Sequence, residues 1–192
     1  DPSHSGARPL ILIVGDDGHQ VADTARTRLD RLVAPEDRAF GLEIVEGQAD
    51  KIEQALASLR QCLEAIRTVG LLGGGKVVWW RGVNFLGASL VGRNRDVQET
   101  LGMLVEQIRA GFPPRHTLLI TAPKADARTA FVKLCAAQGE LVTCSAPDRP
   151  WQRDQAAEAS VSRALQQTGI QADQELVRRF VQKVGTDGAQ IA

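Results

Sequence analysis

Five short apolar segments recur along the first 144 residues, and their regular spacing restricts the folds that the chain can adopt. Each segment has five to seven residues, is rich in β-branched or bulky apolar side chains, and is bounded by polar or turn-forming residues. Runs of this length and composition are typical of buried β-strands. The segments are LILIV (10–14), LEIVE (42–46), KVVWW (76–80), HTLLITA (116–122) and ELVTC (140–144).

Helical periodicity fills the intervals between these segments. Apolar residues recur there at spacings of three and four positions, which indicates amphipathic helices over 21–32, 50–68, 97–108 and 127–139. Strands that alternate with helices form parallel sheets covered on both faces, because each crossover helix packs back onto the sheet. We therefore expect an α/β fold built on a parallel five-stranded sheet with helices on both faces.

The pattern changes after Ser145, where APDRPW brings two prolines and the strand-like runs stop. Only helical periodicity follows, so we expect a first domain over residues 1–146 and a small all-helical domain over 147–192. Asp173 is placed to cap the second of two helices there. The expected apolar faces of the two helices are Ala157, Val161, Ala164 and Leu165, and Leu176, Phe180, Val181 and Val184.

Charge and composition exclude several classes of protein. The 23 basic and 23 acidic residues balance, so no overall field draws the chain to nucleic acid or to an anionic membrane. No apolar run approaches the roughly 18 residues that span a bilayer, and the start is too polar for a signal peptide; we expect a cytoplasmic protein without membrane contact. The three cysteines and three histidines are dispersed, so we expect reduced thiols and no metal site.

The stretch GLLGGGKVVWW (70–80) partly matches the phosphate-binding pattern G-x-x-x-x-G-K-[ST]. Val77 stands where that pattern needs a hydroxyl residue, and the glycines follow a predicted helix and precede a predicted strand. A phosphate loop has the opposite order, because the anion must meet the positive start of a helix. Lys76 is therefore interpreted as the first residue of a strand, and the glycines as a helix stop and turn.

The loop after the first strand is where such a sheet would bind a nucleotide, yet GDDG (15–18) offers no Gly-Lys-Ser/Thr ending. Asp16 and Asp17 would repel phosphate. Two acidic residues before a helix more often cap it and place a favourable negative charge at its start than serve metal or acid-base chemistry. We expect no cofactor and no catalytic residue in this chain.

Leu71 and Leu72 stand beside the glycines in a stretch too short to bury them easily. They either pack into the sheet or form an exposed apolar tip, a feature that often marks a partner surface.

Taken in their order along the chain, the strand, loop and helix segments described above resemble the delta subunit of the bacterial DNA polymerase III clamp loader. The more specific ones are the acidic pair after the first strand, the block from Thr68 to Val78, and LITAPKADAR from Leu119 to Arg128. The resemblance covers nearly the whole chain. It implies an AAA+/RecA-like first domain without a working nucleotide site, then a helical lid and a collar domain. The collar is absent here, so we expect the chain to be a piece of a longer protein.

The resemblance also implies a role for the two leucines. In delta subunits an apolar pair at this helix tip enters a hydrophobic pocket of the sliding clamp (beta) and helps to open the ring. Leu71 and Leu72 occupy the matching positions, and Leu72 departs from the Leu-Phe pair that family members often carry. The implied partners are the sliding clamp, other clamp-loader subunits, and primer-template DNA through the assembled complex. The chain would have no catalysis of its own, although it would belong to a polymerase (nucleotidyltransferase) holoenzyme.

Two other functions stay open from the residues alone. An ATPase or nucleotide-dependent transferase would use Lys76 or Lys124 with the Asp16-Asp17 pair. A stand-alone DNA-binding module would use local basic groups, although aromatic platforms are scarce, because at least one of Trp79 and Trp80 should face the core. The basic residues are Arg93, Arg95, Lys124, Arg128, Arg149 and Arg153.

Overall fold

The computed structural model describes residues 9–69 and 75–144, and further along residues 154, 155, 157–159, 161, 162, 165, 170 and 172–184. The chain divides into two compact units, residues 1–144 and residues 145–192.

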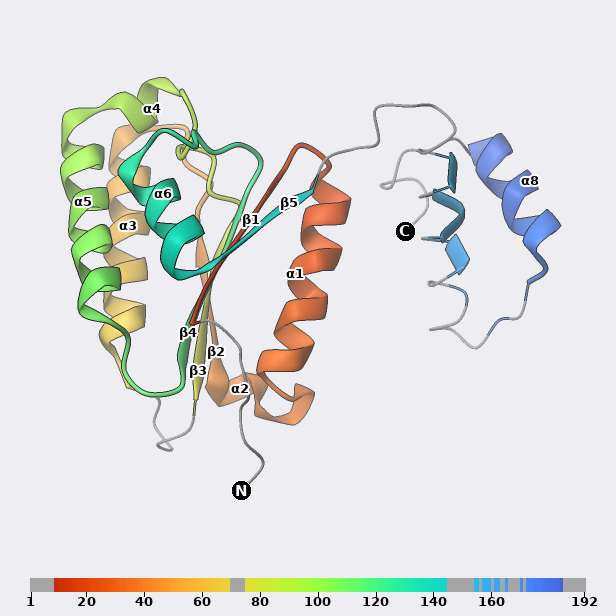
Figure 1. The fold of residues 1–192 in the computed structure, drawn as a ribbon, viewed down its shortest axis with the longest axis horizontal. Coiled ribbons are helices and arrows are strands. Elements are labelled where there is room, and N and C mark those ends of the chain that lie inside the picture. The colour runs from red at the N-terminus through yellow and green to blue at the C-terminus, as the bar shows by residue number, and fades with distance from the viewer. Residues whose placement is uncertain are drawn as a thin grey trace. The chain divides into compact units, whose positions relative to one another are not determined.

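The first unit is built on one parallel sheet that contains all five predicted strands (Figure 1). The order across the sheet is β2-β3-β4-β1-β5, so that β1 lies between β4 and β5. In this register Leu12 lies opposite both Ile120 and Leu141. The expected α/β class is confirmed. The strands are β1 (Leu10–Gly15), β2 (Leu42–Glu46), β3 (Lys76–Arg81), β4 (His116–Ala122) and β5 (Glu140–Cys144).

Helices cover both faces of the sheet, with α1 on one face and α3, α5 and α6 on the other (Figure 1). Side chains of a strand point alternately to the two faces. In β1, Leu10 and Leu12 join the core under α3, α5 and α6, whereas Ile11 and Ile13 join the core under α1. The helices are α1 (Gly18–Leu32), α3 (Ile52–Arg67), α5 (Arg95–Ala110) and α6 (Ala130–Gln138).

Two short helices and one 3-10 turn were not predicted from the sequence. A helix of four residues makes little more than one turn, so it leaves no periodic pattern to detect. These elements are η1 (Pro35–Asp37), α2 (Arg38–Gly41) and α4 (Leu90–Arg93). Among the described residues, no helix is long and apolar enough to cross a membrane.

The two tryptophans of β3 are both buried, on opposite faces of the sheet. Trp79 packs in the core under α1, and Trp80 packs in the core under the other three helices. The Trp80 indole N–H donates to Ser58 Oγ at 2.8 Å, and that hydroxyl donates to the Glu46 carbonyl at 2.6 Å. A satisfied polar chain therefore links α3 to β2 and β3 inside an apolar core.

The described part of the second unit is helical and has its own small core. As predicted, the Asp173 carboxylate accepts from the Leu176 N–H at 2.7 Å, at the start of α8 (Gln174–Val184). The predicted apolar face of α8 is partly wrong. Leu176 and Phe180 are 60% and 43% exposed, whereas Val177 and Val181 are buried with residues of the preceding helical segment. The buried residues of this core are Ala157, Val161, Val177 and Val181.

Candidate functional site

The candidate site lies where α3 ends and β3 begins, at the end of the sheet at which the strands start. Leu71 and Leu72, the predicted clamp-binding pair, lie outside the described residues. The residues that flank them are described. Val69 is 62% exposed, and Gly75 directly precedes β3.

Lys76 connects the end of α3 to the sheet. Its Nζ donates to the carbonyl of Ala65 at 2.8 Å and to that of Thr68 at 3.2 Å, and lies 2.6 Å from Glu43 Oε2. The last carbonyls of a helix have no partner within the helix and carry partial negative charge, so a cation satisfies them well. The Lys76 side chain is only 7% exposed. Its amine faces a helix end that would repel phosphate, which supports the interpretation of Lys76 as the first residue of a strand.

His116 and the turn before it hold the same end of the sheet. The ring nitrogens of His116 lie 3.1 Å from the Pro114 carbonyl (Nδ1) and 3.4 Å from the Thr68 carbonyl (Nε2). Arg115 has a φ of 63°, a left-handed conformation that is uncommon outside glycine. The Lys76 N–H donates to the Arg115 carbonyl at 3.1 Å, so the start of β3 is held against the start of β4.

Gly75 suits this close approach, because a larger residue would crowd the Arg115 backbone. A Cβ at this position would lie 3.0 Å from the Arg115 carbonyl oxygen and 3.3 Å from the Arg115 Cβ. Of the glycines in this stretch, Gly75 therefore has a structural explanation that does not involve phosphate. Sequence reasoning did not identify Glu43 and His116 as parts of this site, because they come from other strands and only the strand order brings them to Lys76.

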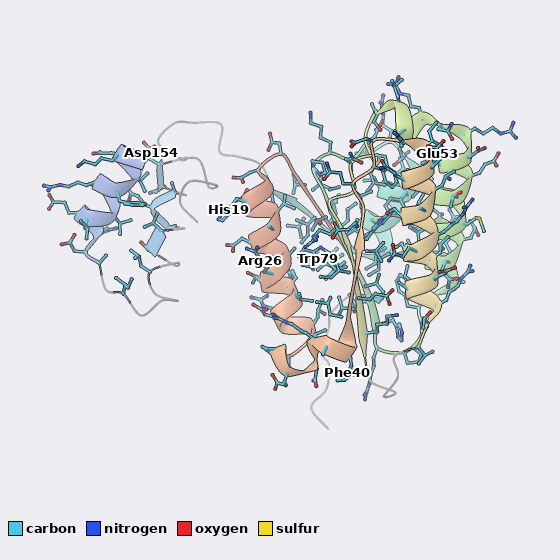
Figure 2. All side chains as sticks on the ribbon, turned by 180° about the vertical axis from the view of Figure 1, so that it is seen from behind. His19, Arg26, Phe40, Glu53, Trp79 and Asp154 are labelled. Atoms are coloured by element: carbon cyan, nitrogen blue, oxygen red, sulfur yellow. The ribbon has the colours of Figure 1, made fainter. Side chains whose placement is uncertain are left out.

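The opposite end of the sheet holds the loop where a nucleotide would bind. Asp17 caps α1, and its Oδ1 accepts from the N–H groups of His19 and Gln20 at 3.0 Å each. These N–H groups are the ones that a bound phosphate would use. Asp16, Arg26 and Trp79 line a cavity of about 440 Å³ beside this loop, and Figure 2 labels Arg26 and Trp79 between α1 and the sheet. The Asp17 carboxylate therefore takes the N–H groups at the helix start, as the sequence predicted for a helix cap.

The basic residues considered for nucleic acid are only partly brought together. Arg93 and Arg128 line one cavity of about 330 Å³, whereas Arg95 pairs with Glu99 at 2.7 Å. Arg128 pairs with Asp126 at 2.8 Å, and hydrogen bonds from Arg128 lower the pKa of that carboxyl to about 2. Arg149 and Arg153 lie outside the described residues, and Lys124 is exposed.

The three cysteines are all buried and none forms a disulfide. Burial raises the pKa of the Cys62 thiol, with a smaller contribution from the Glu43 carboxylate, and burial raises the pKa of Cys135 to about 12. Such thiols are poor nucleophiles, because the thiolate is the reactive form. Within the part of the chain that the structure describes, no group of three or more His, Cys, Asp or Glu side chains is placed to hold a metal ion.

Comparisons with known proteins agree with the fold. A family model described as DNA polymerase III, delta subunit, matches residues 11–145, which is more than half of the chain. The solved structure of the DNA clamp loader delta protein of Bacillus subtilis is similar, with a TM-score of 0.62 and 16% sequence identity. The similarity covers 96% of this chain and 51% of that one, so the chain spans about half of its length. No curated protein sequence matches the chain.

Proposed function

The chain belongs to the DNA polymerase III delta subunit family, and on this basis we propose that it binds the sliding clamp through Leu71 and Leu72 and helps to open the ring. The observation that carries the proposal is the set of contacts that anchors the residues on both sides of the segment that bears the two leucines. Lys76, Glu43 and His116 tie the end of α3 to the starts of β3 and β4. Anchored flanks suit a segment that inserts into a pocket, because the flanks themselves lose little conformational freedom on binding.

Two leucine side chains supply enough free energy for a contact of this kind. Their full burial contributes about 3–6 kcal/mol before the costs of association. Binding opens the ring only if the open form of the clamp offers a better fit than the closed form, since a ligand shifts an equilibrium by its differential affinity alone. We propose that the leucines make this distinction at the clamp interface.

The wider partners follow from the same proposal. Other clamp-loader subunits and primer-template DNA would contact this protein in the assembled loader, in the cytoplasm where the clamp is loaded. The chain would contribute protein contacts and no catalysis, with an AAA+-type first domain that does not use a nucleotide. The Asp17 cap supports the last point, because its carboxylate takes the N–H groups of His19 and Gln20.

Calorimetric titration of the chain against the sliding clamp of the same organism tests the proposal. We expect wild type to bind, and the double variant Leu71→Ala/Leu72→Ala to bind at least about 30-fold more weakly, as hot-spot residues cost 2 kcal/mol or more on truncation. Leu90→Ala is the matched control. Leu90 is 89% exposed on α4, which follows the far end of β3, so its truncation should leave the affinity unchanged.

Two results would contradict the proposal. Absence of binding by wild type would remove the clamp as a partner of this chain. Equal affinities for wild type and the double leucine variant would leave the partner but move the contact away from Leu71 and Leu72.

A further inference from the structure

We infer that Phe40 of α2 is a second apolar contact to the sliding clamp, next to the segment that carries Leu71 and Leu72. The inference rests on the proposed function and extends its site to a residue from a different part of the chain. Phe40 is 66% exposed, the most exposed aromatic side chain among the described residues. Figure 2 shows it at the end of the sheet where the strands begin.

Strand register places Phe40 beside the leucine-bearing segment. Leu42, the first residue of β2, pairs with Val77 of β3. Two residues before Leu42 the chain reaches Phe40, and two residues before Val77 it reaches Gly75. Phe40 and Gly75 therefore precede two neighbouring parallel strands at the same end of the sheet. Gly75 directly follows residues 70–74 in the sequence.

Packing at Gly41 supports this placement independently. A Cβ at Gly41 would lie 3.4 Å from Val33 Cγ1 and 3.5 Å from the Gly75 carbonyl oxygen. Gly41 is thus enclosed between the end of α1 and the start of β3, with Phe40 as its direct neighbour in sequence. The Leu42 N–H donates to the Arg38 carbonyl, and Arg38 pairs with Asp30 of α1, so α2 is held at both ends.

Two of the charged residues close to Phe40 in sequence are paired, whereas Glu36 and Asp37 are exposed. Arg38 is paired with Asp30, and Glu43 is paired with Lys76. Paired charges cost less to cover than free ones, because part of their field is already neutralised. Val69, 62% exposed, adds a further apolar side chain on the α3 side of the segment. Aromatic residues are enriched at the centres of protein interfaces, and the backbone of Phe40, in a helix held at both ends, loses little freedom on binding.

Phe40→Ala measured in the same clamp titration tests the inference. We expect about tenfold weaker binding to the clamp, as for an aromatic contact of moderate weight. Phe180→Ala is the matched control, because Phe180 is an exposed phenylalanine of the second unit and its change should leave the affinity equal to wild type. Because Phe40 is largely exposed, its variant should keep the wild-type melting temperature, which separates a contact effect from misfolding.

The outcomes distinguish this inference from the proposed function. If the double leucine variant binds weakly and Phe40→Ala binds as wild type does, Phe40 is not a clamp contact and the proposed function stands. If Phe40→Ala weakens binding and the leucine changes do not, the Phe40 contact stands and the leucine assignment fails. Sedimentation provides a third outcome. If wild type forms a dimer, Phe40→Ala is a monomer and the two bind the clamp equally well, the Phe40 side chain contacts a second copy of this chain and the inference is overturned.

Discussion

Lys76 is a buried cation whose three ammonium hydrogens all have acceptors. An ammonium donates three hydrogen bonds, and the carbonyls of Ala65 and Thr68 and the carboxylate of Glu43 provide three acceptors. The same residue completes the seventh place of a phosphate-binding pattern in the sequence. What separates the two roles is the element on each side of the lysine, since the end of a helix attracts a cation and the start of a helix attracts an anion.

Replacement of this lysine should destabilise the first unit. Lys76→Met keeps the volume of the side chain but leaves two helix-end carbonyls and the Glu43 carboxylate without their cation. We expect the free energy of unfolding to fall by about 2–3 kcal/mol. This loss is smaller than for a fully buried ion pair, because the Glu43 side chain is 40% exposed and water can solvate its carboxylate. Urea denaturation followed by tryptophan fluorescence measures this change, because Trp79 and Trp80 lie in the strand that Lys76 begins.

Lys133→Met provides the control for this variant. Lys133 is an exposed residue of α6, so its replacement should change stability by less than about 0.5 kcal/mol. Equal midpoints for Lys76→Met and Lys133→Met would mean that the buried lysine does not hold α3 to the sheet.

Among the helices and strands, those long enough to show a repeating apolar pattern were predictable from the sequence. The five strands and four longer helices of the first unit were identified from apolar runs and from spacings of three and four residues. The sequence pattern does not reveal the strand order β2-β3-β4-β1-β5. This order depends on how helices and strands far apart in the sequence pack against each other. For the same reason the contacts of Glu43 and His116 with the end of α3 came only from the structure.

The face of α8 and the exposure of Phe40 show the same limit. The helix α8 carries apolar residues at 176, 177, 180 and 181, so two neighbouring stripes compete, and the partner helix selects Val177 and Val181. Phe40 lies in a helix of four residues that has no period, so no local pattern indicates whether its ring is buried. The assignment of Leu71 and Leu72 came from a family resemblance and stays a prediction.

The start of α1 provides a test of the nucleotide alternative. Asp17→Ala removes an N-cap, and we expect a loss of about 1 kcal/mol in the free energy of unfolding. Neither wild type nor this variant should bind ATP with Mg²⁺ in a calorimetric titration, because the loop lacks the lysine and hydroxyl that hold phosphate and metal.

Asp16→Ala is the control for the cap, since Asp16 is exposed and does not accept the first N–H groups of α1. Its stability should equal that of wild type. Micromolar binding of ATP by wild type would contradict the reading of this loop as a helix cap and would favour the ATPase or transferase alternative.

For the whole molecule, the apolar cores follow the division into two units. Two clusters of buried residues cover the faces of the sheet and lie wholly within residues 10–144, and a third lies within residues 157–181. No described cluster combines residues of both units. A domain of about 140 residues buries enough surface to be stable alone. The proposed clamp contacts, Phe40, Leu71 and Leu72, all belong to the first unit.

A fragment of residues 1–144 should therefore fold by itself and bind the clamp with the affinity of the whole chain. Trp79 and Trp80 report on its unfolding, and we expect its melting temperature to match that of the corresponding transition in the 192-residue chain, because both sheet cores are intact. Thermal unfolding and the clamp titration measure the two properties separately. An unfolded fragment would show that residues 145–192 are needed for the stability of the sheet. A folded fragment with weaker binding would show that the second unit also contacts the clamp, because the loss could not then arise from the cores.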